Sequence, residues 1–244
     1  MRVLITGAHG KLGKEVSKLY PGAWRPTHEE MPVERIDLVI KYIESVKPDI
    51  LIHLAAMVSP PRCEVNKALA WDINVNGTSN LIDSCLTHKK DTYFILMSTP
   101  CVFNGDDEEP KDEKHYPDAD NFYGFTKACQ ELLVQNSGLD YLIVRGNFVP
   151  REPWPYPKAF TDRKSNYLFA DQLARGIKDI IDVRDIGIRH VLGNKILSMW
   201  DLAQMCPNSK DVGPITLEEY HGDCKLTRNM VLESHCWRKY DIGG

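Results

Sequence analysis

A phenol, an ammonium group and two hydroxyls are spaced in this chain so that they could transfer a proton to or from a substrate. Tyr123 and Lys127 stand four positions apart in segment 123–127, which reads YGFTK, so both lie on one face if the segment is helical. A phenol has an ordinary pKa of about 10, and a neighbouring ammonium would lower it by stabilising the phenolate. An apolar run ends in Ser98 and Thr99, whose hydroxyls could hydrogen-bond a substrate oxygen beside the phenol. These residues predict general acid–base catalysis.

A glycine-rich loop follows the first apolar run and precedes a stretch of helical periodicity. Segment 7–13 reads GAHGKLG. Backbone N–H groups converge at a helix N-terminus, and glycines remove the side chains that would keep a pyrophosphate away. The spacing predicts that a dinucleotide binds through Gly7, His9, Gly10, Lys11, Leu12 and Gly13. An oxidised nicotinamide of such a dinucleotide would also lower the pKa of Tyr123.

The segment that follows the first predicted helix indicates which dinucleotide binds. An acidic residue there bonds the ribose hydroxyls of NAD, whereas a basic residue accepts the 2′-phosphate of NADP. Segment 23–28 reads AWRPTH and holds no acidic residue. Arg25, Thr27, His28 and Lys11 therefore favour NADPH over NADH, although Arg25 could also be an ordinary solvated surface residue.

Apolar runs of strand length alternate with helix-period stretches through about residue 145, which is the pattern of a parallel sheet covered by crossover helices. The predicted strands are Val3 to Thr6, Ile50 to Leu54, Phe94 to Ser98, Leu142 to Arg145 and His190 to Leu192. The predicted helices are Lys11 to Tyr20, Arg35 to Val46, Asn74 to His88, Phe125 to Ser137, Ala170 to Ile181 and Ser198 to Met205. The fold class is α/β: a Rossmann-type doubly wound parallel sheet with a small C-terminal substrate-binding lobe.

Four prolines between residues 150 and 157 mark the beginning of that lobe, because they exclude a regular helix or a central strand. We expect residues 1–148 to form the NAD(P)-binding domain, with residues 168–192 contributing a helix and a strand. Residues 149–167 and 193–244 would form the substrate-binding lobe.

The composition excludes several classes of protein. The chain has 244 residues, 43% of them hydrophobic, and a formal charge of -4, so it can bury a core but has no positive field for nucleic acid or an anionic membrane. Its longest apolar stretch is far shorter than the roughly 20 residues that span a bilayer. Seven cysteines without a CxxC pair favour reduced thiols over disulfides or a metal site. No signal-peptide pattern precedes the glycine loop, which favours a cytoplasmic location.

Seven segments resemble the extended short-chain dehydrogenase/reductase superfamily, and within it the dTDP-4-dehydrorhamnose reductase family. They read TGAHGKLG (6–13), KPDILIHLAA (47–56), NVNGTSNLI (74–82), STPCVFNG (98–105), YGFTK (123–127), VRGNF (144–148) and ADQLARGI (170–177). The resemblance implies NAD(P)H-dependent reduction of a nucleotide-linked 4-keto-6-deoxysugar, an activity of dTDP-rhamnose biosynthesis. It also implies that Thr99, Tyr123 and Lys127 form the catalytic triad.

The same resemblance implies which residues bind the cofactor and the substrate. Beside the glycine loop, the dinucleotide would contact Leu54, Ala55, Ala56, Asn74, Ser98, Tyr123 and Lys127. Asn74 could instead be a structural helix residue. The nucleotide-sugar would contact Arg145, Asn147 and, in the proline-rich segment, Trp154, although Arg145 and Asn147 could also be structural.

Two alternative functions and a possible homodimer also remain open. Cys101 stands where bifunctional 3,5-epimerase/4-reductases similar to GDP-fucose synthase place a cysteine acid/base, but segment 147–152 lacks the histidine that would partner it. The chain also resembles the noncatalytic β-subunit of methionine adenosyltransferase, which would make it a dinucleotide-binding regulator. Superfamily relatives often dimerise through paired helices, which here would include Phe125 to Ser137.

Overall fold

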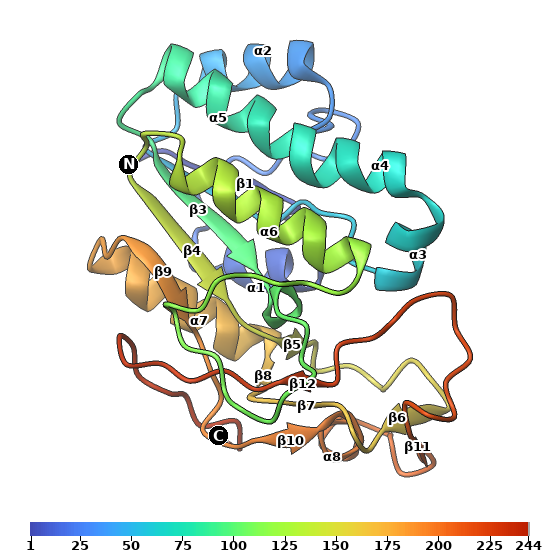
Figure 1. Ribbon diagram of the computed structural model, residues 1–244. Helices are drawn as coiled ribbons and strands as arrows, with labels where there is room; N and C mark the ends of the chain where they lie inside the picture. The colour runs from blue at the N-terminus through green and yellow to red at the C-terminus, as the bar shows by residue number, and fades with distance from the viewer. Residues whose placement is uncertain (244) are drawn as a thin grey trace.

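The computed structural model describes residues 1–243 and is built around one parallel sheet. Its five strands lie in the order β1 (Val3–Thr6), β2 (Ile50–His53), β3 (Tyr93–Ser98), β4 (Tyr141–Arg145) and β9 (Gly187–His190) (Figure 1). Every pair of neighbouring strands is parallel. The predicted α/β fold with a parallel central sheet is confirmed. The last strand ends at His190, where we expected it to begin, because the chain after it turns into the layer of short strands.

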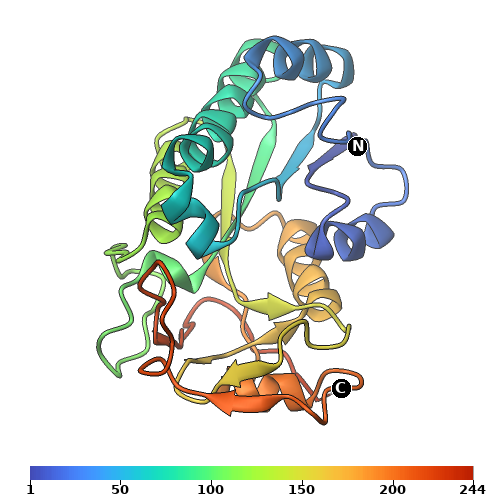
Figure 2. The same ribbon diagram turned by 90° about the vertical axis from the view of Figure 1, so that its right-hand side faces the viewer.

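Helices cover both faces of the sheet (Figure 2). One face carries α1 (Lys11–Leu19) and α7 (Ala170–Asp182), and the other carries α2 (Ile36–Val46), α5 (Gly77–His88) and α6 (Phe122–Gln135). Side chains alternate along each strand, so Ile95 packs toward the first face and Leu96 toward the second. Burial on both faces is the reason that these strands read as continuous apolar runs.

The helical path that leads into α5 is longer than predicted. It begins with α3 (Pro60–Val65) and α4 (Lys67–Trp71) and continues through a π-helical turn, Asp72–Asn76. We predicted that the helix begins at Asn74, which in fact lies inside the π-helical turn. The two prolines that open α3 occupy its first turn, where a missing N–H costs no hydrogen bond.

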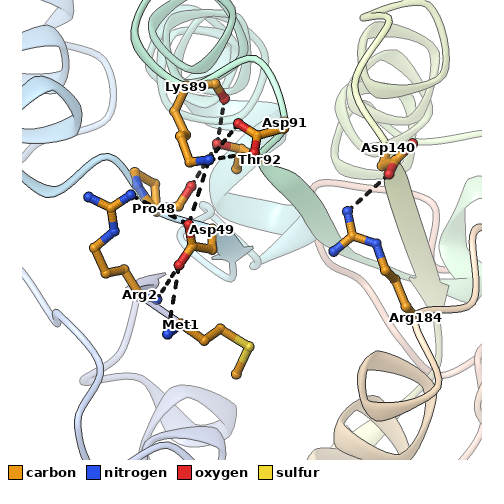
Figure 3. A network of polar contacts seen from close by, with 9 residues as sticks. All are labelled: Met1, Arg2, Pro48, Asp49, Lys89, Asp91, Thr92, Asp140 and Arg184. Atoms are coloured by element: carbon orange, nitrogen blue, oxygen red, sulfur yellow. Dashed lines mark hydrogen bonds and ion pairs between the residues drawn. The ribbon is translucent and has the colours of Figure 1, made fainter.

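A polar network joins the amino ends of the strands (Figure 3). Asp49 accepts a hydrogen bond from the Arg2 backbone at 2.7 Å and pairs with the Lys89 ammonium at 3.6 Å. The Thr92 hydroxyl donates to the carbonyl of Pro48 at 2.8 Å. At the amino ends of the strands, the protein's own polar groups therefore bind one another. The functional candidates lie at the carboxyl ends.

Beyond the carboxyl ends of the strands lies a layer of short strands (Figure 1). These are β5 (Phe148–Val149) with β8 (Leu168–Phe169), β6 (Lys158–Phe160) with β11 (Gly213–Ile215), and β7 (Lys164–Ser165) with β10 (Leu197–Ser198) and β12 (Asn229–Met230). Helix α8 (Met199–Gln204) follows β10. One apolar cluster joins this layer to the sheet, since it contains Phe169, Leu202 and Met230 together with Cys101 and Tyr123. Among residues 1–243, no helix combines the length and the apolar character that crossing a membrane requires.

Candidate active site

The glycine loop between β1 and α1 is shaped by close backbone contacts. Gly7 has a φ of +66°, and a Cβ atom on it would lie 2.6 Å from the Ala55 nitrogen. A Cβ atom on Gly13 would lie 2.1 Å from the Gly7 carbonyl oxygen. Gly10 caps α1 without a side-chain hydrogen bond, so the first N–H groups of the helix are available to a ligand. The loop has the geometry that a bound phosphate requires.

Thr6 and His53 fix the segment that packs against this loop. The Thr6 hydroxyl oxygen accepts hydrogen bonds from the backbone of Leu54 and of Ala55, both at 3.2 Å, and lies 2.7 Å from Nδ1 of His53. Burial lowers the pKa of His53 to about 3, so the imidazole is neutral. Its Nε2 lies 3.0 Å from the Thr78 hydroxyl. Sequence reasoning gave no role to Thr6 or His53, although both lie in segments that resemble the family.

Both polar atoms of the Asn74 side chain form hydrogen bonds within the protein. Its Oδ1 accepts from the Met57 N–H at 2.8 Å, and its Nδ2 donates to the Met57 carbonyl at 3.1 Å and to the Thr126 hydroxyl at 2.9 Å. We expected Asn74 to contact the cofactor, but every polar atom of its amide already has a partner. In this structure the Asn74 side chain ties segment 54–57 to α6, and its contact with a cofactor stays a prediction.

Tyr123 lies in the first turn of α6, which begins at Phe122, three residues before the predicted beginning at Phe125. The Asn121 side chain caps the helix by accepting from the Gly124 N–H at 2.9 Å. A Cβ atom on Gly124 would lie 2.0 Å from the Cys101 carbonyl oxygen, so only glycine lets α6 approach the 3₁₀ turn Pro100–Val102. This approach brings the Tyr123 phenol near the Thr99 side chain, which influences its pKa.

The electrostatics of Tyr123 differ from our expectation. Burial raises the pKa of the phenol above its usual value of 10, and the nearby Thr99 side chain opposes only part of that rise. Without a cofactor the net change in the pKa is therefore upward, and the lowering by Lys127 together with an oxidised nicotinamide stays a prediction. The phenol is protonated at neutral pH.

Lys127 follows Tyr123 by one helical turn and is almost completely buried. Its Nζ donates to the Met97 carbonyl at 2.8 Å, next to the end of β3. Burial lowers the pKa of Lys127 to about 8, and the charge of Glu131 opposes that change. Tyr123, Thr99 and Lys127 thus meet where the carboxyl end of β3 faces α6.

Arg145 and Ser98 share one buried acid. The Arg145 guanidinium is 1% exposed and binds Glu131 through Nη2 at 2.6 Å and Nε at 3.0 Å. The Ser98 hydroxyl donates to Glu131 at 2.5 Å. Our expectation that Arg145 contacts the substrate is not supported, because its guanidinium is buried in an ion pair with Glu131. Ser98 is likewise turned toward Glu131.

The residues expected to select NADP lie at the surface near the end of α1. Arg25 donates to the backbone carbonyls of Tyr20 and Pro21, so its guanidinium is partly engaged in holding the end of the helix. Thr27 forms a local turn with Glu30, and His28 lies 3.6 Å from Glu34. Lys11 pairs with Glu152, which lies in the proline-rich segment, and His9 is exposed.

The remaining substrate candidates lie in the lobe. The Asn147 amide contacts the Met230 sulfur at 3.4 Å, and Cys101 contacts the same sulfur at 3.7 Å. The Trp154 indole donates to the Lys158 carbonyl at 3.2 Å, so its polar atom is already satisfied. A cavity of about 380 Å³ is lined in part by Lys225. The Lys225 carbonyl accepts a hydrogen bond from Asn121, the residue that caps α6, at 3.2 Å. The cavity lining consists of Asp106, Leu217, Tyr220, Gly222, Cys224, Lys225, Leu226 and Arg228.

Comparison with known families decides where this arrangement belongs. The family model described as the RmlD substrate binding domain matches residues 1–162. The chain belongs to the RmlD substrate binding domain family. The predicted resemblance to dTDP-4-dehydrorhamnose reductases within the extended short-chain dehydrogenase/reductase superfamily is confirmed.

Individual RmlD-like relatives agree with this placement. The chain is 30% identical over 149 residues to dTDP-4-dehydrorhamnose reductase of Aggregatibacter actinomycetemcomitans, covering 59% of this chain and 50% of that protein. It is also 30% identical over 155 residues to methionine adenosyltransferase 2 subunit beta of Rattus norvegicus, covering 59% and 46%. The chain thus spans about half the length of the curated relatives it matches.

The fold agrees over a longer stretch than the sequence does. The structure of dTDP-4-dehydrorhamnose reductase from Bacillus anthracis in complex with NADP superposes with a TM-score of 0.86 at 23% identity. The superposition covers 95% of this chain and 90% of that one. The layer of short strands therefore belongs to the shared fold, although its sequence resembles the family weakly.

Proposed function

We propose that the chain is an NADPH-dependent reductase of a nucleotide-linked 4-keto-6-deoxysugar, similar to dTDP-4-dehydrorhamnose reductase. The observation that carries the proposal is the meeting of Tyr123, Thr99 and Lys127 at the carboxyl end of β3. Segment 54–57 links this point to the glycine loop through Asn74. In a chain of the RmlD family, this arrangement favours a reductase.

Each side chain then has a defined task. The glycine loop would hold the pyrophosphate on the N–H groups of α1, and bound NADPH would supply a hydride to the keto carbon. Tyr123, which is protonated at neutral pH, would donate its proton to the forming alkoxide. Thr99 would hydrogen-bond the same oxygen, and Lys127 would stabilise the phenolate that remains. We propose that the sugar nucleotide enters from the lobe, past Asn147 and Trp154.

NADPH is the cofactor we propose, in preference to NADH. The exposed and half-exposed groups near the end of α1 include Arg25 and His28, which could bind a 2′-phosphate. The Arg25 Nε is buried and has no partner among the described residues, so the guanidinium has donor capacity left. The ratio of the dissociation constants of NADPH and NADH, for this chain and for Arg25→Ala, tests the preference.

We also propose that two copies associate through α4, α5 and α6. Trp71 and Phe125 contact each other at the outer surface, with ring centroids 6.2 Å apart, and Leu132 on the same side of α6 is 57% exposed. An apolar groove of about 580 Å³ runs between these helices. Its lining consists of Trp71, Val75, Ser79, Ile82, Asp83, Leu86, Cys129, Leu132, Leu133, Asn136 and Ser137. A second copy could cover it by a two-fold contact.

Oxidation of NADPH with a panel of 4-keto-6-deoxysugar nucleotides tests the proposed reaction. We expect turnover with at least one of them, and a loss of about 100-fold or more in kcat for Tyr123→Phe with an unchanged dissociation constant for NADPH. Tight NADPH binding without turnover, together with co-purification of another protein, would instead favour a regulatory subunit like that of methionine adenosyltransferase. Equal turnover by Tyr123→Phe would contradict the assignment of the proton donor.

A further inference from the structure

Glu131 extends the row formed by Tyr123 and Lys127 along α6. The three residues follow one another at intervals of four positions and share one face of the helix. The Glu131 side chain is 0% exposed. A buried carboxylate is costly unless it is paired, and here it accepts hydrogen bonds from Ser98 and from two nitrogens of Arg145.

The groups around Glu131 hold the carboxylate in one place. Ser98 and Arg145 are neighbours in register at the ends of β3 and β4, so both donors belong to rigid strands. The Arg145 guanidinium also stacks on the Phe103 ring, with its carbon 5.0 Å from the centroid. From β9, His190 places Nε2 3.5 Å from Arg145, and the Glu113 carboxylate accepts from the His190 N–H at 3.3 Å.

Lys127 and Glu131 reach consecutive residues of β3, since the Lys127 ammonium binds the Met97 carbonyl and the Glu131 carboxylate binds the Ser98 hydroxyl. The Lys127 Nζ has a hydrogen bond to the neutral Met97 carbonyl, and His53 from β2 is the second titratable group that senses its charge. Because His53 is neutral, it adds no positive charge that would repel the ammonium. The Glu131 carboxylate is the anion that favours a charged Lys127.

We infer that Glu131 is a positioning residue: its carboxylate, fixed by Ser98 and Arg145, keeps Lys127 in the ammonium form beside Tyr123. This inference rests on the proposed function, in which a charged Lys127 stabilises the Tyr123 phenolate after proton transfer. Burial already lowers the pKa of Lys127 to about 8. Without the Glu131 charge, Lys127 would lose its proton at a lower pH and become neutral under ordinary conditions.

Two variants separate this role from a purely structural one. Glu131→Gln leaves the Arg145 charge buried and unpaired, which can prevent folding. The double variant Glu131→Gln/Arg145→Met removes both charges and keeps the side-chain volumes similar, so we expect it to fold. The matched control is Asp182→Asn, which removes the acid from another pair at i and i+4, Lys178 and Asp182, on α7.

The measurement is the titration of Lys127, followed by NMR of ¹³Cε-labelled lysine and assigned by its loss in Lys127→Arg. We expect the pKa of Lys127 to fall by about one unit or more in Glu131→Gln where it folds, to fall less in the double variant because loss of the Arg145 cation opposes loss of the acid, and to stay unchanged in Asp182→Asn. The alkaline limb of the pH profile of kcat should move by the same amount in each variant. A Lys127 titration that coincides with that of the unsubstituted chain in every folded Glu131 variant would overturn the inference.

The titration also distinguishes failure of this inference from failure of the proposed function. It requires neither cofactor nor turnover. If no sugar nucleotide is reduced and the Lys127 titration still moves, the reductase proposal fails while the control of the Lys127 charge by Glu131 is supported. If the sugar is reduced and the titration does not move, only the inference about Glu131 fails.

Discussion

The Asn74 amide binds both backbone polar groups of Met57, accepting from its N–H at 2.8 Å and donating to its carbonyl at 3.1 Å. The Asn74 amide thereby satisfies the backbone polar groups of Met57 in the way that a neighbouring strand would. Because Nδ2 also reaches Thr126 on α6 at 2.9 Å, one buried amide joins the wall of the glycine loop to the helix that carries Tyr123.

We therefore predict that Asn74→Ala lowers the free energy of unfolding by about 2 to 4 kcal/mol, since it leaves the Met57 N–H and carbonyl buried without partners. Urea unfolding measures this, and the dissociation constant of NADPH should rise in parallel. The control is Asn76→Ala in the same π-helical turn, where the exposed side chain bonds only to Asp72 and the loss should stay below about 0.5 kcal/mol. Equal losses in the two variants would contradict this account.

Gly13→Ala should weaken NADPH binding at least about tenfold, because its Cβ would lie 2.1 Å from the Gly7 carbonyl oxygen and push the loop out of shape. Gly22→Ala is the matched control, since a Cβ at Gly22 meets no atom within 4 Å. Fluorescence titration with NADPH measures both. If Gly13→Ala binds NADPH as tightly as Gly22→Ala does, the phosphate cradle lies elsewhere.

Two buried histidines should make the protein less stable in acid. Burial lowers the pKa of His53 to about 3 and that of His190 to about 4, whereas both have their ordinary value of 6.5 when unfolded. Below that value the unfolded chain binds more protons, so the free energy of unfolding should fall as the pH drops from about 6.5 to 4. The slope reaches about 1.4 kcal/mol per pH unit for each histidine.

Urea unfolding at a series of pH values tests this dependence. His53→Gln should flatten the slope by the contribution of one proton, because the amide does not titrate. His221→Gln, at an exposed position, should leave the slope unchanged. A slope that is the same in all three proteins would show that His53 is not the group that titrates.

Cys101→Ala should keep the rate of sugar reduction within about threefold of the unsubstituted chain. Within residues 1–243 the Met230 sulfur, at 3.7 Å, is the one hydrogen-bond partner of the Cys101 thiol, and the backbone N–H of residue 101 should still bond to Thr99 in the variant. NADPH oxidation in deuterated water tests the alternative. Solvent deuterium at sugar C3 or C5, lost in Cys101→Ser, would instead support an epimerase that uses Cys101.

Leu132→Glu should convert a dimer into a monomer, because it places a charge in the groove between α5 and α6. Val183→Glu offers a matched control, since Val183 is 64% exposed at the end of α7, on the opposite face of the sheet. Analytical ultracentrifugation gives the mass of each. A monomeric unsubstituted chain would exclude the proposed association.

The sequence could predict the sheet and the helix that carries Tyr123 and Lys127, because strands buried on both faces and helices with one buried face leave strong periodic signals. It could not predict α3, since two prolines at its beginning resemble a loop signal. The strands of the lobe are two or three residues long and have no measurable periodicity.

Two features of the site could not be predicted because they depend on contacts between elements that are separate in the sequence. The partner of Arg145 is Glu131, which lies 14 residues earlier on another element, and no local pattern announces that pairing. The direction of the Tyr123 pKa depends on how deeply the first turn of α6 is buried, which a single chain segment does not reveal. The cytoplasmic location and the roles of the catalytic and cofactor-binding residues stay predictions.

Because of the π-helical turn Asp72–Asn76, the orientation of Asn74 depends on the number of residues in this segment as well as on their types. A turn of this kind contains one residue more than an ordinary helical turn, and each residue rotates a helix by about 100°. A natural deletion of one residue here would leave a regular, stable helix, yet it would turn Asn74 away from Met57. In a chain shortened in this way, we expect that a side chain from a different position would have to anchor the same segment.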